Sequence, residues 1–404
     1  MFSDSQKKID SSFRYLLISR SSRSIALVFV SLAFSLYLNV LGYSLIFIGL
    51  LYLIIVLFNV FLSLAIGMIG DRIGYSRALI IGELFPLAGL AGLAISTNIY
   101  IIAFSAILGG ISGTAGGLRG AFSPGSTAFI ASNWPREVSR VDKLAKVNIV
   151  ASLSSIIGGF LLITHGYLYQ FYGSAGTFRV LFAIAFVILL VSVISLLFLK
   201  ERRRPRKTST VMKKESLSYS LRIIIPNIIN GSAIGIAIPL LPLWFELRFH
   251  VSVSFVGEIF TFAYVATALG SYISGRYLNS EKISAIAVSS VARFFQGLLF
   301  IAIAFSPFVL IAFSLYALRS GIAGMGAPMR SAISVRGIGN EDYGAASSIQ
   351  GIATRGSQMT SGLSGYLMDT YLPSPLFIGG IIQISGSFIY YRIIRNWEKE
   401  RNVN

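Results

Sequence analysis

The sequence has 404 residues, of which 54% are apolar and 12% are charged, and its net charge is +18. Because a soluble domain carries about 25% charged residues, this composition excludes an ordinary soluble globular protein. The chain contains no cysteine, which excludes a disulfide framework, a thiolate metal site and a cysteine nucleophile.

Long apolar runs recur along nearly the whole chain, and each is long enough to cross roughly 30 Å of hydrocarbon. They predict an all-α membrane protein with twelve transmembrane helices, whereas a β-barrel would show alternating segments of about 10 residues. The predicted spans are 24–41, 45–66, 78–96, 99–131, 147–166, 177–199, 222–245, 252–274, 283–305, 308–334, 344–368 and 375–394. The fourth and tenth runs exceed a simple span, so part of each is expected to tilt or to leave the bilayer.

A polar segment rich in Lys and Arg interrupts the apolar pattern at 200–221 and predicts a linker between two six-helix bundles, 24–199 and 222–395. Short tails, 1–23 and 396–404, complete the predicted domain organisation. The two bundles resemble each other in sequence: Ser44 and Gly49 correspond to Ser252 and Gly257, and further pairs include Gly117 with Gly321 and Pro124 with Pro328. This internal repeat predicts two pseudo-symmetric halves.

Most of the 34 Lys and Arg residues lie in the two tails, the linker and the loops on one side of the predicted membrane. Only Arg179 and Arg248 fall in the opposite loops. By the positive-inside rule this asymmetry places both termini in the cytoplasm, and it explains the basic charge by topology and by contact with anionic membrane lipids. No nucleic-acid partner is expected.

A short loop between the second and third spans reads Gly67-Met-Ile-Gly-Asp71-Arg72-Ile-Gly74-Tyr-Ser-Arg77. Its spacing, G-x-x-x-D-R-x-G-x-x-R, resembles the signature loop of the major facilitator superfamily of secondary transporters. The resemblance implies two parallel six-helix repeats that rock about a site near the membrane midplane. It also implies that the protein is a multi-pass monomer in the plasma membrane.

In that family the loop aspartate latches the two halves together at the start of a helix in the other half. The resemblance therefore predicts a conformational latch made of Gly67, Asp71, Arg72, Gly74 and Arg77, with a partner helix that begins near 340–344. A carboxylate at a helix N-terminus contributes about 0.3–1 kcal/mol, which suits a contact that releases in every cycle. The alternative interpretation is a turn that only sets topology. The sequence departs from the family pattern at Tyr75 and Ser76, where basic residues are usual.

Six ionisable residues lie inside apolar runs: Glu83, Arg119, Glu258, Arg293, Arg319 and Arg355. Such a residue costs about 2.5–3.5 kcal/mol at the centre of a span, so each should face a partner or a cavity. The family arrangement of spans makes Arg119, Glu258, Arg319 and Arg355 candidates for substrate binding or coupling. Glu83 and Arg293 fall in peripheral spans, where structural pairing is expected. For every arginine, a satisfied structural role remains an equal alternative.

Polar residues within the spans add Asn148, Asn230 and Gln350 as substrate candidates, although such side chains also bond neighbouring helices. The fifth span keeps Gly158 and Gly159 of the motif typical of drug/proton antiporters but lacks its Gly-Pro pair.

The resulting hypothesis is a secondary transporter of a small solute, with proton-linked efflux of drugs or metabolites as the first candidate. Transport of an organic anion, a carboxylate or phosphate ester held by arginines, is the alternative. A non-transporting receptor or a polytopic membrane enzyme is the candidate from another class. No enzyme is predicted, because the chain lacks a phosphate-binding Gly-x-x-x-x-Gly-Lys-Ser/Thr run and an H-E-x-x-H motif. No cofactor and no metal are expected.

Overall fold

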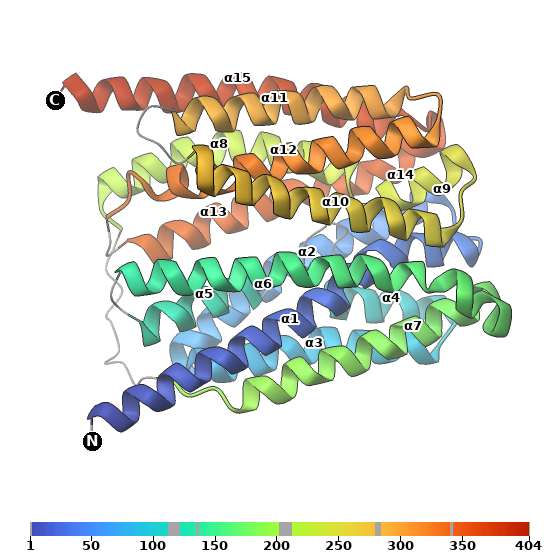
Figure 1. The fold of residues 1–404 in the computed structure, drawn as a ribbon, viewed down its shortest axis with the longest axis horizontal. Coiled ribbons are helices and arrows are strands. Elements are labelled where there is room, and N and C mark those ends of the chain that lie inside the picture. Colours follow the sequence, from blue (N-terminus) through green and yellow to red (C-terminus); the bar gives the residue numbers. More distant parts are fainter. Residues whose placement is uncertain are drawn as a thin grey trace. The chain divides into compact units, whose positions relative to one another are not determined.

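The computed structural model describes residues 2–111, 122–134, 137–201, 212–278, 284–339 and 342–403. Across these ranges the chain is built from helices and contains no strand (Figure 1). Ten helices in the described part are long and apolar enough to cross a membrane, which confirms the all-α membrane architecture. The count of twelve stays a prediction, since neither the fourth predicted span, 99–131, nor the eleventh, 344–368, is among these ten.

The chain divides into two compact units. Unit 1 comprises residues 1–43, 54–209 and 252–261, and unit 2 comprises 44–53, 210–251 and 262–404. The helices of the first half are α1 (Phe2–Val40), α2 (Leu45–Ile73), α3 (Tyr75–Ile95), α4 (Ile99–Gly109), α5 (Phe122–Asn133), α6 (Glu137–Ile163) and α7 (His165–Leu197). Those of the second half are α8 (Lys214–Ala237), α9 (Leu241–Phe249), α10 (Val253–Ile273), the π-helical η1 (Ser274–Leu278), α11 (Ala285–Ala304), α12 (Val309–Val335), α13 (Tyr343–Ser357), the 3₁₀ turn η2 (Gln358–Thr360), α14 (Ser361–Thr370) and α15 (Ser374–Val403).

In unit 1, α1 packs against α6 and α7, and α3 packs against α4, α5 and α7. One hydrophobic cluster joins Phe13 of α1 to Phe129 of α5, Leu196 of α7 and Trp134. The rings of Phe13 and Trp134 meet edge to face at 5.6 Å, an arrangement that adds about 0.5–1.5 kcal/mol to the burial itself. The long first helix is therefore held by packing well before its predicted span begins.

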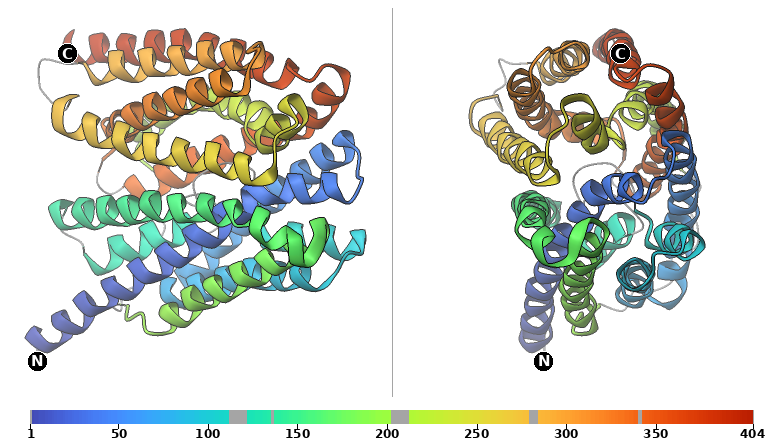
Figure 2. Two further views of the ribbon diagram at one scale, coloured as in Figure 1. Left: turned by 45° about the vertical axis from the view of Figure 1, so that its right-hand side comes forward. Right: turned by 90° about the vertical axis from the view of Figure 1, so that its right-hand side faces the viewer.

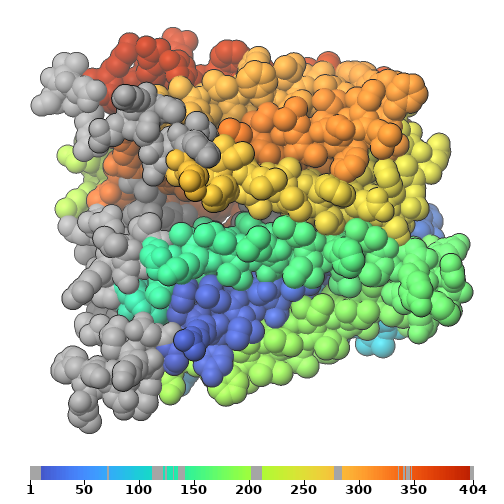
Figure 3. Space-filling view, viewed as in Figure 1, coloured from blue at the N-terminus to red at the C-terminus, as the bar shows by residue number. Residues whose placement is uncertain are grey.

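In unit 2, α15 packs along α8 and α11, and α11 packs along α12 (Figure 2). In the space-filling view α10, α11 and α12 form adjoining yellow and orange bands (Figure 3). These helices expose large apolar side chains, among them Phe262, Leu310 and Leu318. Such a surface is suited to hydrocarbon, since lipid tails are as apolar as the side chains that they contact.

The helices α2 and α10 each begin in one unit and continue in the other. In unit 2, a Cβ added to Gly49 of α2 would lie 2.8 Å from the backbone nitrogen of Gly365 in α14. In unit 1, a Cβ added to Gly257 of α10 would lie 2.8 Å from the backbone nitrogen of Ile163 in α6. Gly49 and Gly257 are the repeat-related glycines of the sequence, and each permits a close contact between helix backbones.

Two predicted spans that lie wholly within the described part do not form a single α-helix. The span 222–245 is broken, because α8 ends at Ala237 and α9 begins at Leu241 with Pro242 in its first turn; Pro239 lies in the break and has no N–H to continue the helix. The span 344–368 changes from α- to 3₁₀-helical geometry part-way along: α13 ends at Ser357, η2 follows, and α14 begins at Ser361.

The helix α7 is kinked at Gly173, where φ is 66° and ψ is −176°. A side chain rarely adopts this left-handed φ, so glycine suits the position. The segment before the kink, beginning at His165, exposes Tyr167, Tyr169 and Phe171. Tyrosine-rich segments of this kind are typical of the boundary between hydrocarbon and water.

Candidate functional site

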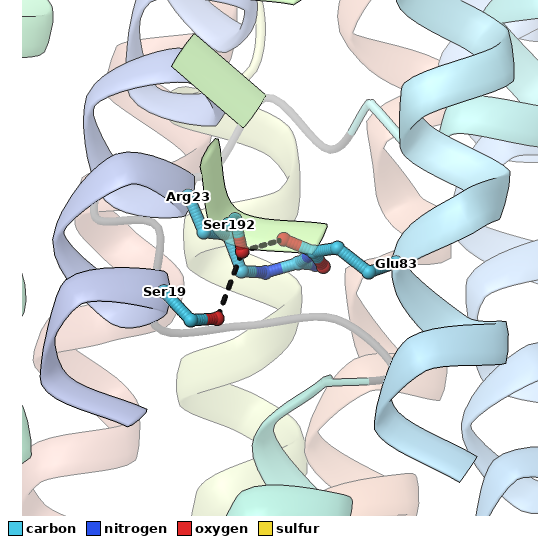
Figure 4. A network of polar contacts seen from close by, with 4 residues as sticks. All are labelled: Ser19, Arg23, Glu83 and Ser192. Carbon is cyan, nitrogen blue, oxygen red and sulfur yellow. Dashed lines mark hydrogen bonds and ion pairs between the residues drawn. The ribbon is translucent and has the colours of Figure 1, made fainter. Parts of the chain in front are cut away.

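A buried ion pair lies at the centre of unit 1, where α1, α3 and α7 meet (Figure 4). Glu83 of α3 is fully buried and pairs through Oε2 with Nη1 of Arg23. The Ser192 hydroxyl of α7 donates to Glu83 Oε1 at 2.6 Å. Since the Ser192 proton is used in that bond, Ser19 of α1 donates to the Ser192 oxygen at 2.8 Å.

A second arginine belongs to the same region. Arg20 and Arg23 lie over the ring of Phe122, with 5.8 Å and 4.9 Å between guanidinium carbon and ring centroid. Arg20 is 2% exposed, and its Nε and Nη1 atoms have no hydrogen-bond partner in the described part of the chain. Two buried cations thus share one carboxylate. The structural pairing expected for Glu83 is confirmed, whereas Arg23, counted in the sequence as a charge of the cytoplasmic tail, is a core residue.

The signature loop connects the end of α2 to the start of α3. Gly74 adopts φ 99°, and the exposed side chains of Arg72 and Arg77 flank it. The N–H of Ser76, in the first turn of α3, donates to Oε2 of Glu201 at 2.9 Å. The Asp71 side chain and residues 340–341 of its expected partner lie outside the described part, so the latch remains a prediction.

Glu201 is a functional candidate that the sequence interpretation missed, because it follows α7 at the start of a segment assigned to the linker. Its carboxylate supplies the cap that α3 lacks, since Gly74 at the N-cap position makes no side-chain bond. The neighbouring Lys200 is also fixed: its N–H donates to Ser12 Oγ, and its carbonyl accepts from Asn133. The start of the linker is therefore attached to the signature loop within unit 1.

The 3₁₀ turn between α13 and α14 is a polar feature of unit 2. Thr360 Oγ1 donates to the Ser232 carbonyl of α8 at 2.9 Å, and Gly231 and Gly235 of α8 bring its backbone close to Ser357 and Gln358. Gln358 is 4% exposed, and its Nε2 has no partner among the described residues. The Gln358 amide is therefore a buried donor that a bound solute could use.

Three predicted site residues lie around this turn. Arg355 is half-buried in the last turn of α13. Gln350, five residues earlier, donates from Nε2 to the Ser334 carbonyl of α12 at 3.1 Å. Asn230 of α8 accepts from Gln383 of α15 at 3.3 Å. Of the three, Gln350 and Asn230 are bonded to neighbouring helices, and Arg355 lies beside the polar turn itself.

The other predicted site residues are dispersed. The guanidinium of Arg319 lies 3.6 Å from the ring centroid of Phe300 in α11, so it packs between α11 and α12. Glu258 is half-buried near the beginning of α10, and Asn148 is exposed on α6. Arg119 lies outside the described part.

In unit 2, Arg293 of α11 donates from Nη2 to Asn227 Oδ1 of α8 at 2.9 Å and stacks on Tyr390 of α15. Arg293 therefore pairs with the Asn227 amide and the Tyr390 ring, as expected for a structural residue. Among the described residues there is no group of three His, Cys, Asp or Glu side chains that could hold a metal ion.

The sequence matches the profile of the Major Facilitator Superfamily over residues 15–359. A relative in Bacillus subtilis (strain 168), an uncharacterized MFS-type transporter named YhjO, is 29% identical over 130 residues, which span 31% of each chain. The fold is similar to that of the human organic anion transporter MFSD10, with a TM-score of 0.69, 13% identity and coverage of 94% of this chain and 99% of the other. An auto-inhibited peptide transporter of the POT family gives a TM-score of 0.75 at 11% identity, with coverage of 95% and 97%.

Proposed function

The chain belongs to the Major Facilitator Superfamily, and as a multi-pass membrane protein of that family it is a secondary transporter of a small solute. On this premise, we propose that it exports a drug-like or metabolic compound in exchange for protons. Glu258 is the proposed proton-binding group. The two units would expose the solute site to one side of the membrane at a time.

The observation that carries this proposal is the contrast between two acids of the spans. Glu83 is held by Arg23 and by the Ser192 hydroxyl. Protonation of Glu83 in each transport cycle would leave the two buried arginines, Arg20 and Arg23, without a counter-charge. Glu258 is half-buried in α10, and in the described part of the chain neither a hydrogen bond nor an ion pair engages its carboxylate. An acid within a membrane span is expected to serve a partner, a solute or a coupling ion, and this position supports Glu258 as the proton-binding group.

The test begins with ligand-dependent thermal stabilisation of the purified protein at two pH values, since a bound ligand stabilises by mass action. The lipophilic cations or neutral compounds found in this way are then loaded into proteoliposomes with an imposed pH gradient. We expect gradient-driven movement in the wild type and, in Glu258→Gln, movement down the solute gradient only. Glu400→Gln, which alters an exposed acid, serves as the control. Solute movement that ignores the pH gradient, or a Glu258→Gln variant that still responds to it, would contradict the proposal.

A second candidate, transport of an organic anion, is supported by Arg355. This arginine is half-buried beside the 3₁₀ turn between α13 and α14, where its planar guanidinium could bind a carboxylate or phosphate group. The shared fold with MFSD10 is compatible with this candidate but says nothing of the substrate. Stabilisation by carboxylates and phosphate esters that is lost in Arg355→Ala and kept in Arg319→Ala would favour the anion over proton-linked export.

The proposed setting is the plasma membrane, with both termini in the cytoplasm and a monomer as the working form. The supporting observation is the concentration of Lys and Arg on one side of the predicted spans. Anionic lipids are proposed as partners, and no nucleic acid is. A pH-sensitive fluorescent protein fused to the C-terminus would respond to external acid if that terminus were outside, which would overturn the orientation.

A further inference from the structure

The buried cluster of unit 1 carries more positive than negative charge. Arg20 and Arg23 of α1 are both buried, and Glu83 is the buried carboxylate described beside them. Glu83 uses Oε2 for Arg23 and Oε1 for the Ser192 hydroxyl (Figure 4). Among the described residues, no carboxylate forms an ion pair with Arg20.

The other acids described in unit 1 do not compensate Arg20. Asp142 forms an exposed ion pair with a lysine of its own helix, and Glu201 caps the first turn of α3. Glu258 of α10 takes part in no ion pair in the described part of the chain. The described cluster therefore holds two guanidinium groups and one carboxylate, which leaves an excess of one positive charge.

Several hydrogen-bond donors of this cluster have no acceptor. Nε and Nη1 of Arg20, Nε of Arg23 and the hydroxyl of Ser24 have no hydrogen-bond partner among the described residues. Ser24 is also fully buried. Successive residues of a helix are about 100° apart, so these three residues lie within an arc of about 100° around α1. The unused donors therefore belong to one face of the helix.

The ring of Phe122 holds the two cations together. The guanidinium carbons of Arg20 and Arg23 lie 5.8 Å and 4.9 Å from its centroid. A ring attracts a cation through its electron-rich face, but it carries no net charge. The excess positive charge of the cluster therefore remains, and both guanidinium groups lie beside the same ring.

The cluster lies where α1 leaves the hydrocarbon. The part of α1 from Arg20 to its end at Val40 is about 30 Å long at 1.5 Å per residue. This length equals the roughly 30 Å of hydrocarbon that a span must cross. An ion can therefore reach Arg20 from the water at the N-terminal end of α1 without crossing the membrane.

We propose that Arg20 and Arg23 bind a small monovalent anion, such as chloride, inside unit 1, with the Ser24 hydroxyl as a further donor. An uncompensated buried charge is strongly unfavourable, and one monovalent anion neutralises the excess. A dianion would replace it with a negative excess of the same size. Because Arg20 is only 2% exposed, a small ion is favoured over a phosphate ester or a lipid headgroup. The anion adds to the pair of Arg23 with Glu83 and does not replace it.

This site involves neither Glu258 nor Arg355, so its failure would leave the proposed transport activity standing. The first measurement is the Tm of the purified protein as chloride replaces gluconate at constant sodium concentration and pH. A bound ion stabilises by mass action, so a specific site gives a saturable increase. The second measurement is equilibrium binding of radiolabelled chloride to the same protein.

We expect saturable stabilisation and one chloride bound per chain in the wild type. Arg20→Gln, which removes the excess charge, should bind chloride at least tenfold more weakly. Ser24→Ala removes a hydroxyl that has no described partner, so it should fold normally and bind at least threefold more weakly. Arg222→Gln, at an exposed ion pair, is the control and should respond like the wild type.

The proposal is overturned if the wild type binds no chloride and has the same Tm in both salts. It is also overturned if Arg20→Gln and Ser24→Ala bind chloride as the wild type does, because the ion would then lie elsewhere. A purely structural role of Arg20 would change the Tm of Arg20→Gln equally in both salts. Ser24→Ala keeps the site open to test if Arg20→Gln fails to fold.

Discussion

Removal of the Glu83 carboxylate should be the most destabilising single change in unit 1. In Glu83→Gln the side-chain volume is kept, but Arg23 and Arg20 remain buried at 4% and 2% exposure without a counter-charge. Breaking a buried ion pair by removing one partner costs about 3–5 kcal/mol. Since the net stability of a folded protein is about 5–15 kcal/mol, this loss is a large fraction of the total.

The assay is thermal unfolding of the purified protein in detergent, followed by intrinsic fluorescence. A change of 1 kcal/mol shifts the Tm by roughly 2–4 °C in domains of 150–250 residues, so the loss predicts a decrease of roughly 6–20 °C. Glu400→Gln removes the acid of an exposed pair whose side chains are 37% and 58% accessible, and surface pairs contribute only about 0–1 kcal/mol. The two variants change the same chemical group in different environments.

A double-mutant cycle separates the ion pair from general disturbance of the core. Arg23→Met combined with Glu83→Gln removes both charges, so the double variant should lose less stability than the sum of the two single variants. The reasoning fails if Glu83→Gln shifts the Tm no more than Glu400→Gln, or if the single effects add without coupling.

Three further predictions follow from other contacts. Glu201→Gln should weaken the cap on the first turn of α3 and destabilise unit 1 by about 0.5–2 kcal/mol, as measured by thermal unfolding. The control is the neighbouring Lys200→Gln, which leaves the backbone bonds of residue 200 intact. Gly49→Leu should separate α2 from α14, because even a Cβ at this position would press on the Gly365 backbone. The expected result is loss of transport with wild-type expression. Unchanged transport would show that the contact is dispensable. Arg319→Met should lower the free energy of unfolding by about 0.5–2 kcal/mol and leave transport intact, because the Arg319 guanidinium is stacked on Phe300. A selective loss of substrate binding would instead place Arg319 in the transport site.

The sequence predicted the membrane class and most helices because hydrocarbon imposes a simple length and polarity requirement on each span. The break between α8 and α9, which the predicted span 222–245 did not include, coincides with Pro239 and Pro242. The 3₁₀ turn at Gln358 contains no proline and lies against Ser232, Gly231 and Gly235 of α8. Such contacts depend on which helix lies alongside, and a hydropathy pattern does not carry that information.

The charged residues show the same limit. Arg23 was assigned to the cytoplasmic tail by its position before an apolar run, yet α1 is helical and packed through that region. Successive residues of a helix point about 100° apart, so the direction of Arg319 could not be fixed by its place in a span. Hydrogen-bond partners separated by more than a hundred residues, such as Ser76 and Glu201, lie beyond any local pattern.

The kink at Gly173 determines how much of α7 must fit the bilayer. A straight helix of 33 residues would be about 50 Å long at 1.5 Å per residue, far more than the roughly 30 Å of hydrocarbon. Because the chain turns at Gly173, the part from 174 to 197 measures about 36 Å, which a modest tilt accommodates. The kink at this one glycine thus shortens the part of α7 that must cross the hydrocarbon. It also allows the aromatic segment before Gly173 to lie at the level of the lipid headgroups.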